Sequence, residues 1–181
     1  SDSSDIAQNT IERIWDLLFW KEYLDTLAEY KYNVLSLWSL SPFPSLVANP
    51  EFPMMNLSNV LQSTLTPKPS TSGDTLYIDV MGQRLITIKE LTIEEKIAFW
   101  NKVMEYAHER CITVYLFTWN LFIFDSNPYG IDSDVTNEQT KAYLKSSIHA
   151  LLDSYPLLGG FGVTAGEYMS GDGTLDVQYL Y

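Results

Sequence analysis

The sequence predicts an α/β fold in which helices alternate with parallel β-strands. Three stretches rich in apolar residues, 34–40, 111–118 and 159–167, each follow a stretch that is predicted to be helical. Strands that are apolar along both faces are typical of a parallel sheet. The order helix, strand, helix, strand, helix, strand is the pattern of repeated βαβ units. At 181 residues, the chain is long enough for one domain with a sizeable core.

The first helix is predicted over residues 10–31, because apolar residues recur there with helical periodicity. Asn9 is the expected N-cap, with Glu12 as its reciprocal partner. The run 31–33 interrupts the pattern, and the strand 34–40 follows it.

Capping boxes begin the other two predicted helices. Such a box pairs a Ser or Thr N-cap with a Glu or Gln three residues later. The matching pairs are Thr92 with Glu95 and Thr136 with Gln139. We therefore expect one helix over 93–109 and another from 137 to about 153, where Pro156 prevents continuation.

Residues 41–74 are predicted to be irregular, because prolines punctuate them and Ser and Thr fill much of the rest. A loop of this length is usually functional, and a disordered insertion is the alternative. Within it, residues 56–62 could form a short helical turn. Residues 75–80 and 83–88 alternate in polarity around Met81-Gly82, which predicts a hairpin. The chain is thus expected to be a single domain over 1–181, with a loop and hairpin insertion at about 41–91.

Composition excludes several functional classes. The formal net charge is −12, which disfavours nucleic acid and anionic membranes as partners and suits neutral ligands. The single cysteine, Cys111, lies in an apolar run and reads as a small buried hydrophobe rather than a reactive thiol. No metal-ligand spacing, serine-hydrolase elbow or phosphate-binding glycine loop is present, so no cofactor and no metal are expected.

The ends of the three predicted strands carry the candidate binding residues. Carboxyl ends of parallel strands meet at one edge of a sheet, where function collects in β/α folds. Trp38 and Trp119 could form a stacking platform for a sugar, or could simply be core or lid residues. Asn120 could bind a ligand hydroxyl or the local backbone. Asp125 also follows a strand, although a turn role suits it better.

Glu167 is the candidate catalytic residue. The run 159–167 reads as a glycine-rich buried strand that ends in this carboxylate, followed by Tyr168. Strong acids seldom stay buried unless they are paired or functional. A loop glutamate that faces water is the alternative.

Several of these stretches resemble glycoside hydrolase barrels of the alpha-glucuronidase and beta-hexosaminidase-like group. The resemblance is carried by Trp20 to Val34, Leu37-Trp38-Ser39 with Pro42-Phe43-Pro44, Phe117 to Asn120, and Tyr155 to Met169. It implies a (β/α)8 TIM barrel in which Glu167 ends the fourth strand and acts as general acid. The hexosaminidase pattern has an Asp-Glu pair at that strand end, whereas Gly166 precedes Glu167 here, which argues against substrate-assisted hydrolysis.

A complete barrel typically needs about 250 residues. The chain is therefore expected to be a partial barrel, roughly the second to fourth βα units, whose remaining half comes from the same protein or another chain. The expected function is acid/base hydrolysis of a poly- or oligosaccharide by the intact enzyme. A non-catalytic carbohydrate-binding module or an inactive scaffold fragment remains the alternative. A secreted or periplasmic location is expected for such a protein.

Overall fold

The computed structural model describes residues 12–39, 42–63, 85–119, 129–132, 134 and 136–164. Its elements along the chain are η1 (Glu12–Trp15), α2 (Leu17–Glu29), β1 (Val34–Ser39), α3 (Phe43–Leu46), η2 (Pro53–Met55), β2 (Val60–Ser63), β3 (Leu85–Lys89), α4 (Ile93–His108), β4 (Thr113–Trp119), α5 (Glu138–Ser154) and β5 (Leu158–Thr164). The main sheet is parallel and has the order β1-β4-β5, which confirms the predicted α/β class.

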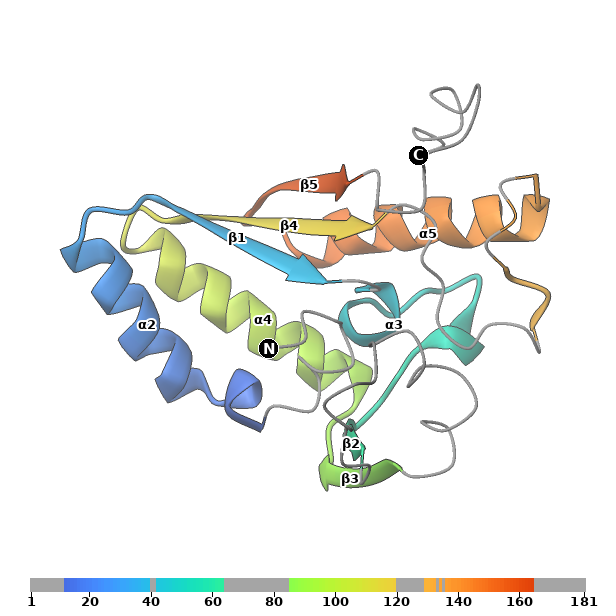
Figure 1. Ribbon diagram of the computed structural model, residues 1–181, viewed down its shortest axis with the longest axis horizontal. Coiled ribbons are helices and arrows are strands. Elements are labelled where there is room, and N and C mark those ends of the chain that lie inside the picture. The colour runs from blue at the N-terminus through green and yellow to red at the C-terminus, as the bar shows by residue number, and fades with distance from the viewer. Residues whose placement is uncertain are drawn as a thin grey trace, which may run out of the picture.

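The three parallel strands point the same way, and α2 and α4 lie side by side beneath them (Figure 1). Alternate residues of β4 are buried, namely Val114, Leu116 and Thr118. Beneath the sheet, the rings of three tryptophans contact one another in tilted and edge-on orientations: the centroid of Trp100 lies 5.1 Å from that of Trp20 and 6.1 Å from that of Trp15. The core therefore sits between the sheet and its helices.

Glycines allow β5 to pair closely with β4. A Cβ at Gly162 would lie 2.3 Å from the Phe117 ring, and one at Gly159 would lie 2.2 Å from Cγ2 of Thr113. The register shifts by one residue near the start of this pairing, where Val114 opposes Leu158 and the next residue opposes Gly160. The glycine-rich sequence is thus explained by large side chains on the neighbouring strand.

The helix starts differ in part from the predictions. The capping box of Thr92 and Glu95 is confirmed, with both reciprocal hydrogen bonds present at the start of α4. The helix predicted over 10–31 is wrong at its start: η1 comes first, and Asp16 caps α2 by accepting a bond from the Leu18 N–H. The predicted cap Asn9 lies outside the described residues.

The third predicted cap is wrong by one residue. Asn137 rather than Thr136 caps α5, because its Oδ1 accepts bonds from the N–H groups of Gln139 and Thr140. The Thr136 hydroxyl instead donates to the Asp134 carboxylate at 2.7 Å. An Asx cap satisfies two N–H groups here, which is why it prevails over the threonine. The helix ends at Ser154, as the following proline predicted.

The proposed helical turn at 56–62 is wrong, because Val60–Ser63 forms strand β2. It pairs antiparallel with β3, which covers most of the second arm of the predicted hairpin. The first arm, residues 75–80, lies outside the described part of the chain. The helical residues of this region are instead α3 and η2, and in each of them proline lies at the first turn.

Helices α2 and α4 end in the same way. Lys31 and Cys111 have φ angles of 64° and 57°, and the next residue of each donates to a carbonyl five positions back, at 2.9 Å. This left-handed turn reverses the chain into the following strand. It also places Cys111 at the surface, so the prediction of a buried cysteine is wrong.

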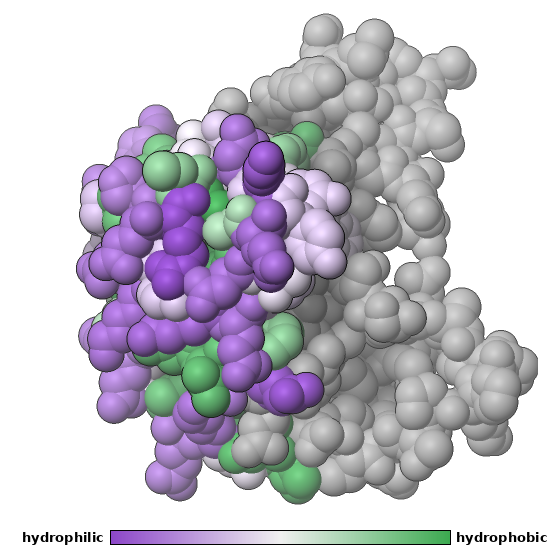
Figure 2. Space-filling model, turned by 90° about the vertical axis from the view of Figure 1, so that its left-hand side faces the viewer, coloured by the Kyte–Doolittle hydropathy of each residue, from purple (hydrophilic) through white to green (hydrophobic). Residues whose placement is uncertain are grey.

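The surface at the amino ends of the strands is mainly hydrophilic, with scattered apolar residues (Figure 2). An ion pair between Asp25 of α2 and Arg110 joins the two helices there. The Tyr106 hydroxyl also donates to Asp25, and the Arg110 guanidinium lies over the Tyr106 ring. Among the described residues, no helix is long and apolar enough to cross a membrane.

Cys111→Gly should raise the free energy of unfolding by up to about 1 kcal/mol. A left-handed conformation costs a residue with a Cβ roughly 1–2 kcal/mol, and the extra chain entropy of unfolded glycine offsets part of that gain. Urea denaturation would measure the change. Cys111→Ala removes the thiol but keeps the Cβ, so it is the control. A glycine variant less stable than the alanine variant would refute the explanation.

Asp25→Asn should lower the melting temperature at pH 7, and the difference should shrink in acid. The hydrogen bond from Arg110 lowers the pKa of Asp25 below its ordinary value of 3.8. The ionised carboxylate therefore stabilises the fold fully above that value, and its contribution is lost as pH falls through the lowered folded pKa. Melting curves between pH 7 and pH 2 test this. Asp153→Asn, at an exposed site on α5, is the control and should leave the melting temperature at pH 7 nearly unchanged.

Candidate functional site

The carboxyl ends of β1, β4 and β5 meet at one edge of the sheet. Register pairs Ser39 with Thr118 and Trp119 with Thr164, so the three strands end side by side. Ser39 and Thr118 are both buried, so the ends of β1 and β4 are packed against the core at this edge. In parallel α/β sheets, ligands bind beyond the carboxyl ends of the strands. This edge is the candidate site.

Two of the predicted site residues lie in the described strands. Trp38 is the penultimate residue of β1 and is half-buried, and position 119 ends β4 on the adjacent strand. Glu167 follows the end of β5 by three residues in the sequence. The remaining predicted residues, outside the described part of the chain, are Asn120, Asp125, Glu167 and Tyr168. Their roles stay predictions.

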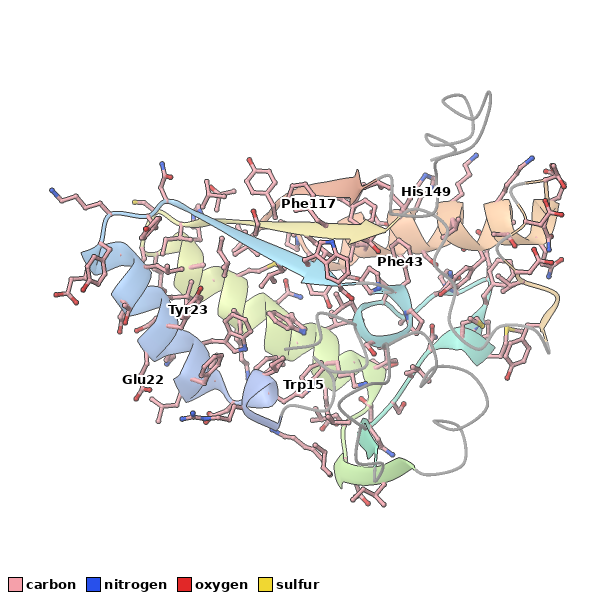
Figure 3. All side chains as sticks on the ribbon, viewed as in Figure 1. Trp15, Glu22, Tyr23, Phe43, Phe117 and His149 are labelled. Atoms are coloured by element: carbon pink, nitrogen blue, oxygen red, sulfur yellow. The ribbon has the colours of Figure 1, made fainter. Side chains whose placement is uncertain are left out.

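The sheet face away from the helices carries aromatic rings that sequence reasoning did not single out. Phe117 lies on this side of β4 (Figure 3), and its ring covers Gly162. The Tyr115 ring likewise lies over Gly160, 3.1 Å from where a Cβ would be. Trp38 pairs in register with Phe117 and so shares its face. The sequence did contain a signal for this arrangement, because a Gly-Gly-x-Gly strand leaves room for the large rings of a neighbouring strand that is rich in aromatic residues.

Asn49 attaches the long segment after β1 to helix α5. It is 1% exposed, and its Nδ2 donates to the hydroxyls of Ser146 and Ser147 at 2.8 and 2.9 Å. Its Oδ1 accepts from the N–H groups of Glu51 and Phe52. The Asn49 side chain thus makes hydrogen bonds both to the backbone of its own turn and to two hydroxyl groups of α5.

Two further polar contacts hold the same segment. The Tyr155 hydroxyl donates to the Leu46 carbonyl at 2.6 Å, and burial raises the pKa of this phenol, so it stays a donor across the physiological range. The buried Lys96 ammonium donates to the Leu57 carbonyl at 2.7 Å. These contacts come from α4 and from the end of α5. The segment beside the carboxyl edge is therefore fixed to the helix layer.

Aromatic packing completes this anchoring. The Phe43 ring lies 5.7 Å from Phe161 of β5 and 6.5 Å from Tyr143 of α5. Figure 3 shows Phe43 in α3, below the carboxyl end of the strands. Through this one side chain, the short helix α3 contacts both β5 and α5.

The carboxylate of Asp134 has a structural role in the turn before α5. The N–H and the hydroxyl of Thr136 both donate hydrogen bonds to the Asp134 carboxylate, and these bonds form the turn before α5. The same bonds lower the pKa of Asp134. In the described ranges, no three His, Cys, Asp or Glu side chains gather as a metal ion would require.

Asn49→Ala should destabilise the protein strongly. The change leaves two serine hydroxyls and two backbone N–H groups without their partner, and a buried polar group without a partner costs about 1–3 kcal/mol. We expect a loss of about 3 kcal/mol, measured by chemical denaturation. Asn33→Ala, at an exposed turn, is the control and should change stability by less than about 0.5 kcal/mol. Equal effects of the two substitutions would contradict the assigned role of Asn49.

Comparison with known proteins identifies a fold relationship. No family model matches the chain, and no curated protein matches it. The fold is similar to part of a solved structure described as a GH138 enzyme targeting pectin rhamnogalacturonan II, with a TM-score of 0.57 and 21% sequence identity. The similarity covers 84% of this chain but 15% of that one. The chain thus shares its α/β architecture with a small portion of a much longer protein.

Proposed function

We propose that the protein supplies part of the catalytic barrel of a glycoside hydrolase that acts on poly- or oligosaccharide. The observation that carries the proposal is the meeting of three parallel strand ends at one edge, in a fold similar to part of a GH138 enzyme. The resemblance to alpha-glucuronidase and beta-hexosaminidase barrels belongs to the same proposal.

Strand order is compatible with one part of a β/α barrel. The order β1-β4-β5 follows the chain without reversal, and α4 and α5 each connect neighbouring strands. Right-handed crossovers that advance in one direction place all helices on one face, as in a (β/α)8 barrel. The face that carries Phe117 would then point to the barrel interior.

The proposed chemistry uses residues at the strand ends. Glu167 donates a proton to the glycosidic oxygen, and Trp38 and Trp119 offer apolar faces to sugar rings. Asn120, Asp125 and Tyr168 supply hydrogen bonds to hydroxyl groups. Glycoside hydrolysis normally uses two carboxyl groups, and we assign the second one to a barrel strand other than β1, β4 and β5. We also propose a secreted or periplasmic location, because polysaccharides are too large to enter cells freely.

The net charge guides the choice of substrates to test. A protein with a net charge of −12 repels polyanions unless cations gather at its site. Neutral oligosaccharides are therefore the first candidates. Pectin-derived oligosaccharides belong in the same panel because of the fold relationship with the GH138 enzyme.

Glu167→Gln in the intact enzyme should lower kcat by roughly 10²–10⁴-fold, because acid–base assistance typically contributes that much. The loss should be smaller for chromogenic glycosides, whose leaving groups need less protonation. Glu138→Gln, at the exposed start of α5, is the matched control and should retain activity. Full activity of Glu167→Gln on a natural glycan would disprove the assignment.

Binding measurements on the same panel distinguish the alternative. A non-catalytic carbohydrate-binding module would bind sugars without cleaving any of them. Calorimetric titration beside the turnover assay therefore decides between enzyme and module. If no sugar in the panel is bound or cleaved, both the enzyme and the binding-module proposals are rejected.

A further inference from the structure

A large apolar cavity is walled mainly by helices α2 and α4 and strand β1. Its volume is about 490 Å³. Aromatic and aliphatic side chains line it, among them Phe19, Trp20, Leu35, Leu37, Trp100 and Met104. Trp15 and Tyr23, which also line it, lie below the strands in Figure 3. Close-packed protein interiors rarely leave voids much larger than a water molecule, whereas ligand pockets span about 300–1,000 Å³. The cavity therefore has the size of a ligand pocket.

Two buried indole groups at the cavity have no hydrogen-bond partner. Trp15 and Trp100 are 2% and 7% exposed, and both line the cavity. Within the described structure, neither Nε1 has a partner. Trp20, which lines the same cavity, instead donates to the Ile14 carbonyl at 2.7 Å. Buried donors are normally satisfied, so these two indole groups point to an occupant that accepts hydrogen bonds.

The cavity walls favour a neutral occupant. Among the described residues that line the cavity, none carries a charge at neutral pH. A charged group that entered such a site would lose its hydration without gaining a partner of opposite charge, which is costly. Water would satisfy the indole donors, but a buried water molecule needs two to four polar partners, and the aromatic and aliphatic walls supply few of them.

The rings around the cavity suit an aromatic occupant. The centroids of Trp15 and Trp100 lie 6.1 Å apart with an edge-on orientation, and those of Phe19 and Trp20 lie 5.4 Å apart in the same way. Rings arranged like this offer both faces and edges, against which a further aromatic ring packs favourably. A carbonyl oxygen attached to such a ring has two lone pairs, so it can accept from either indole group or from both.

We propose that this cavity binds a neutral aromatic molecule whose carbonyl oxygen accepts hydrogen bonds from Nε1 of Trp15 and Nε1 of Trp100. The aromatic ring of the ligand packs against the apolar walls that α2, β1 and α4 provide, and its carbonyl oxygen satisfies the two buried donors. The inference goes beyond the glycoside hydrolase function proposed above, and it does not depend on sugar binding or cleavage.

Nuclear magnetic resonance of the isotope-labelled chain 1–181 tests the proposal, with acetophenone as the probe. The ketone should move the indole N–H signals of Trp15 and Trp100 downfield in a saturable manner, because each donor gains an acceptor. The Trp20 indole, already bonded to the Ile14 carbonyl, is the internal control and should move much less. Isopropenylbenzene has nearly the same shape but carries a methylene group in place of the oxygen, so it should bind without this downfield shift. Substitution of each tryptophan by phenylalanine assigns the signals.

A variant with a larger side chain in the cavity wall locates the binding site. Leu37→Phe adds a ring to the wall and should weaken acetophenone binding by roughly tenfold or more. Leu152→Phe makes the same exchange at a position on α5 that is 50% exposed, so it is the matched control and should leave the affinity unchanged. Equal affinities of the two variants would overturn the proposal, because the probe would then bind elsewhere.

Three results of the spectroscopic experiment would also overturn the proposal. The first is the absence of saturable binding of acetophenone, which would leave water as the occupant. The second is binding that leaves the indole signals of Trp15 and Trp100 in place. The third is an equal downfield shift with isopropenylbenzene, because the oxygen would then play no part.

Discussion

The parallel pairing of β4 with both of its neighbours is the constraint on which the rest of the structure depends. It sets β1, β4 and β5 in one direction and brings their carboxyl ends to one edge. Close approach of β5 requires glycine opposite Phe117 and Tyr115, since a Cβ would meet their rings. On this face of β5, the rings of Tyr115 and Phe117 from β4 therefore occupy the space that side chains of β5 would otherwise fill. The candidate site follows from this geometry.

Buried polar groups, rather than apolar packing alone, fix the segment beside the site. Asn49, Tyr155 and Lys96 each bond the chain after β1 to the helix layer. A buried polar network of this kind is strongly position-specific, because every misplaced partner leaves an unsatisfied group. A rigid floor of this type suits a site whose ligand contacts come from the loops above it.

Much of the fold could be predicted from the sequence, because it depends on local signals. Apolar periodicity identified α2 and α4, capping residues and Pro156 identified α5, and apolar runs identified the three parallel strands. The box of Thr92 and Glu95 located the start of α4. The helix starts at Asp16 and Asn137 were missed, since several neighbouring residues can cap a helix and the sequence does not show which side chain makes the capping hydrogen bonds. Strand β2 was missed because its partner β3 is distant in sequence.

The candidate site could be predicted less completely. Parallel strands imply a shared carboxyl edge, so Trp38 and Trp119 were placed on adjacent strands from their positions alone. The covering of β5 glycines by Phe117, and the anchoring by Asn49, depend on cross-strand register and long-range contacts that a single sequence does not encode locally. The exposure of Cys111 was missed for a related reason: its apolar neighbours suggested a strand, whereas a left-handed turn sets its position.

A crystal structure of the intact protein with a bound oligosaccharide tests the central claim most directly. If the carboxyl edge is the sugar site, a sugar ring will lie beyond the ends of β1, β4 and β5, within contact of Trp38. A sugar bound only at the amino ends of the strands, where hydrophilic side chains of α2 and α4 cover the surface, would contradict the account.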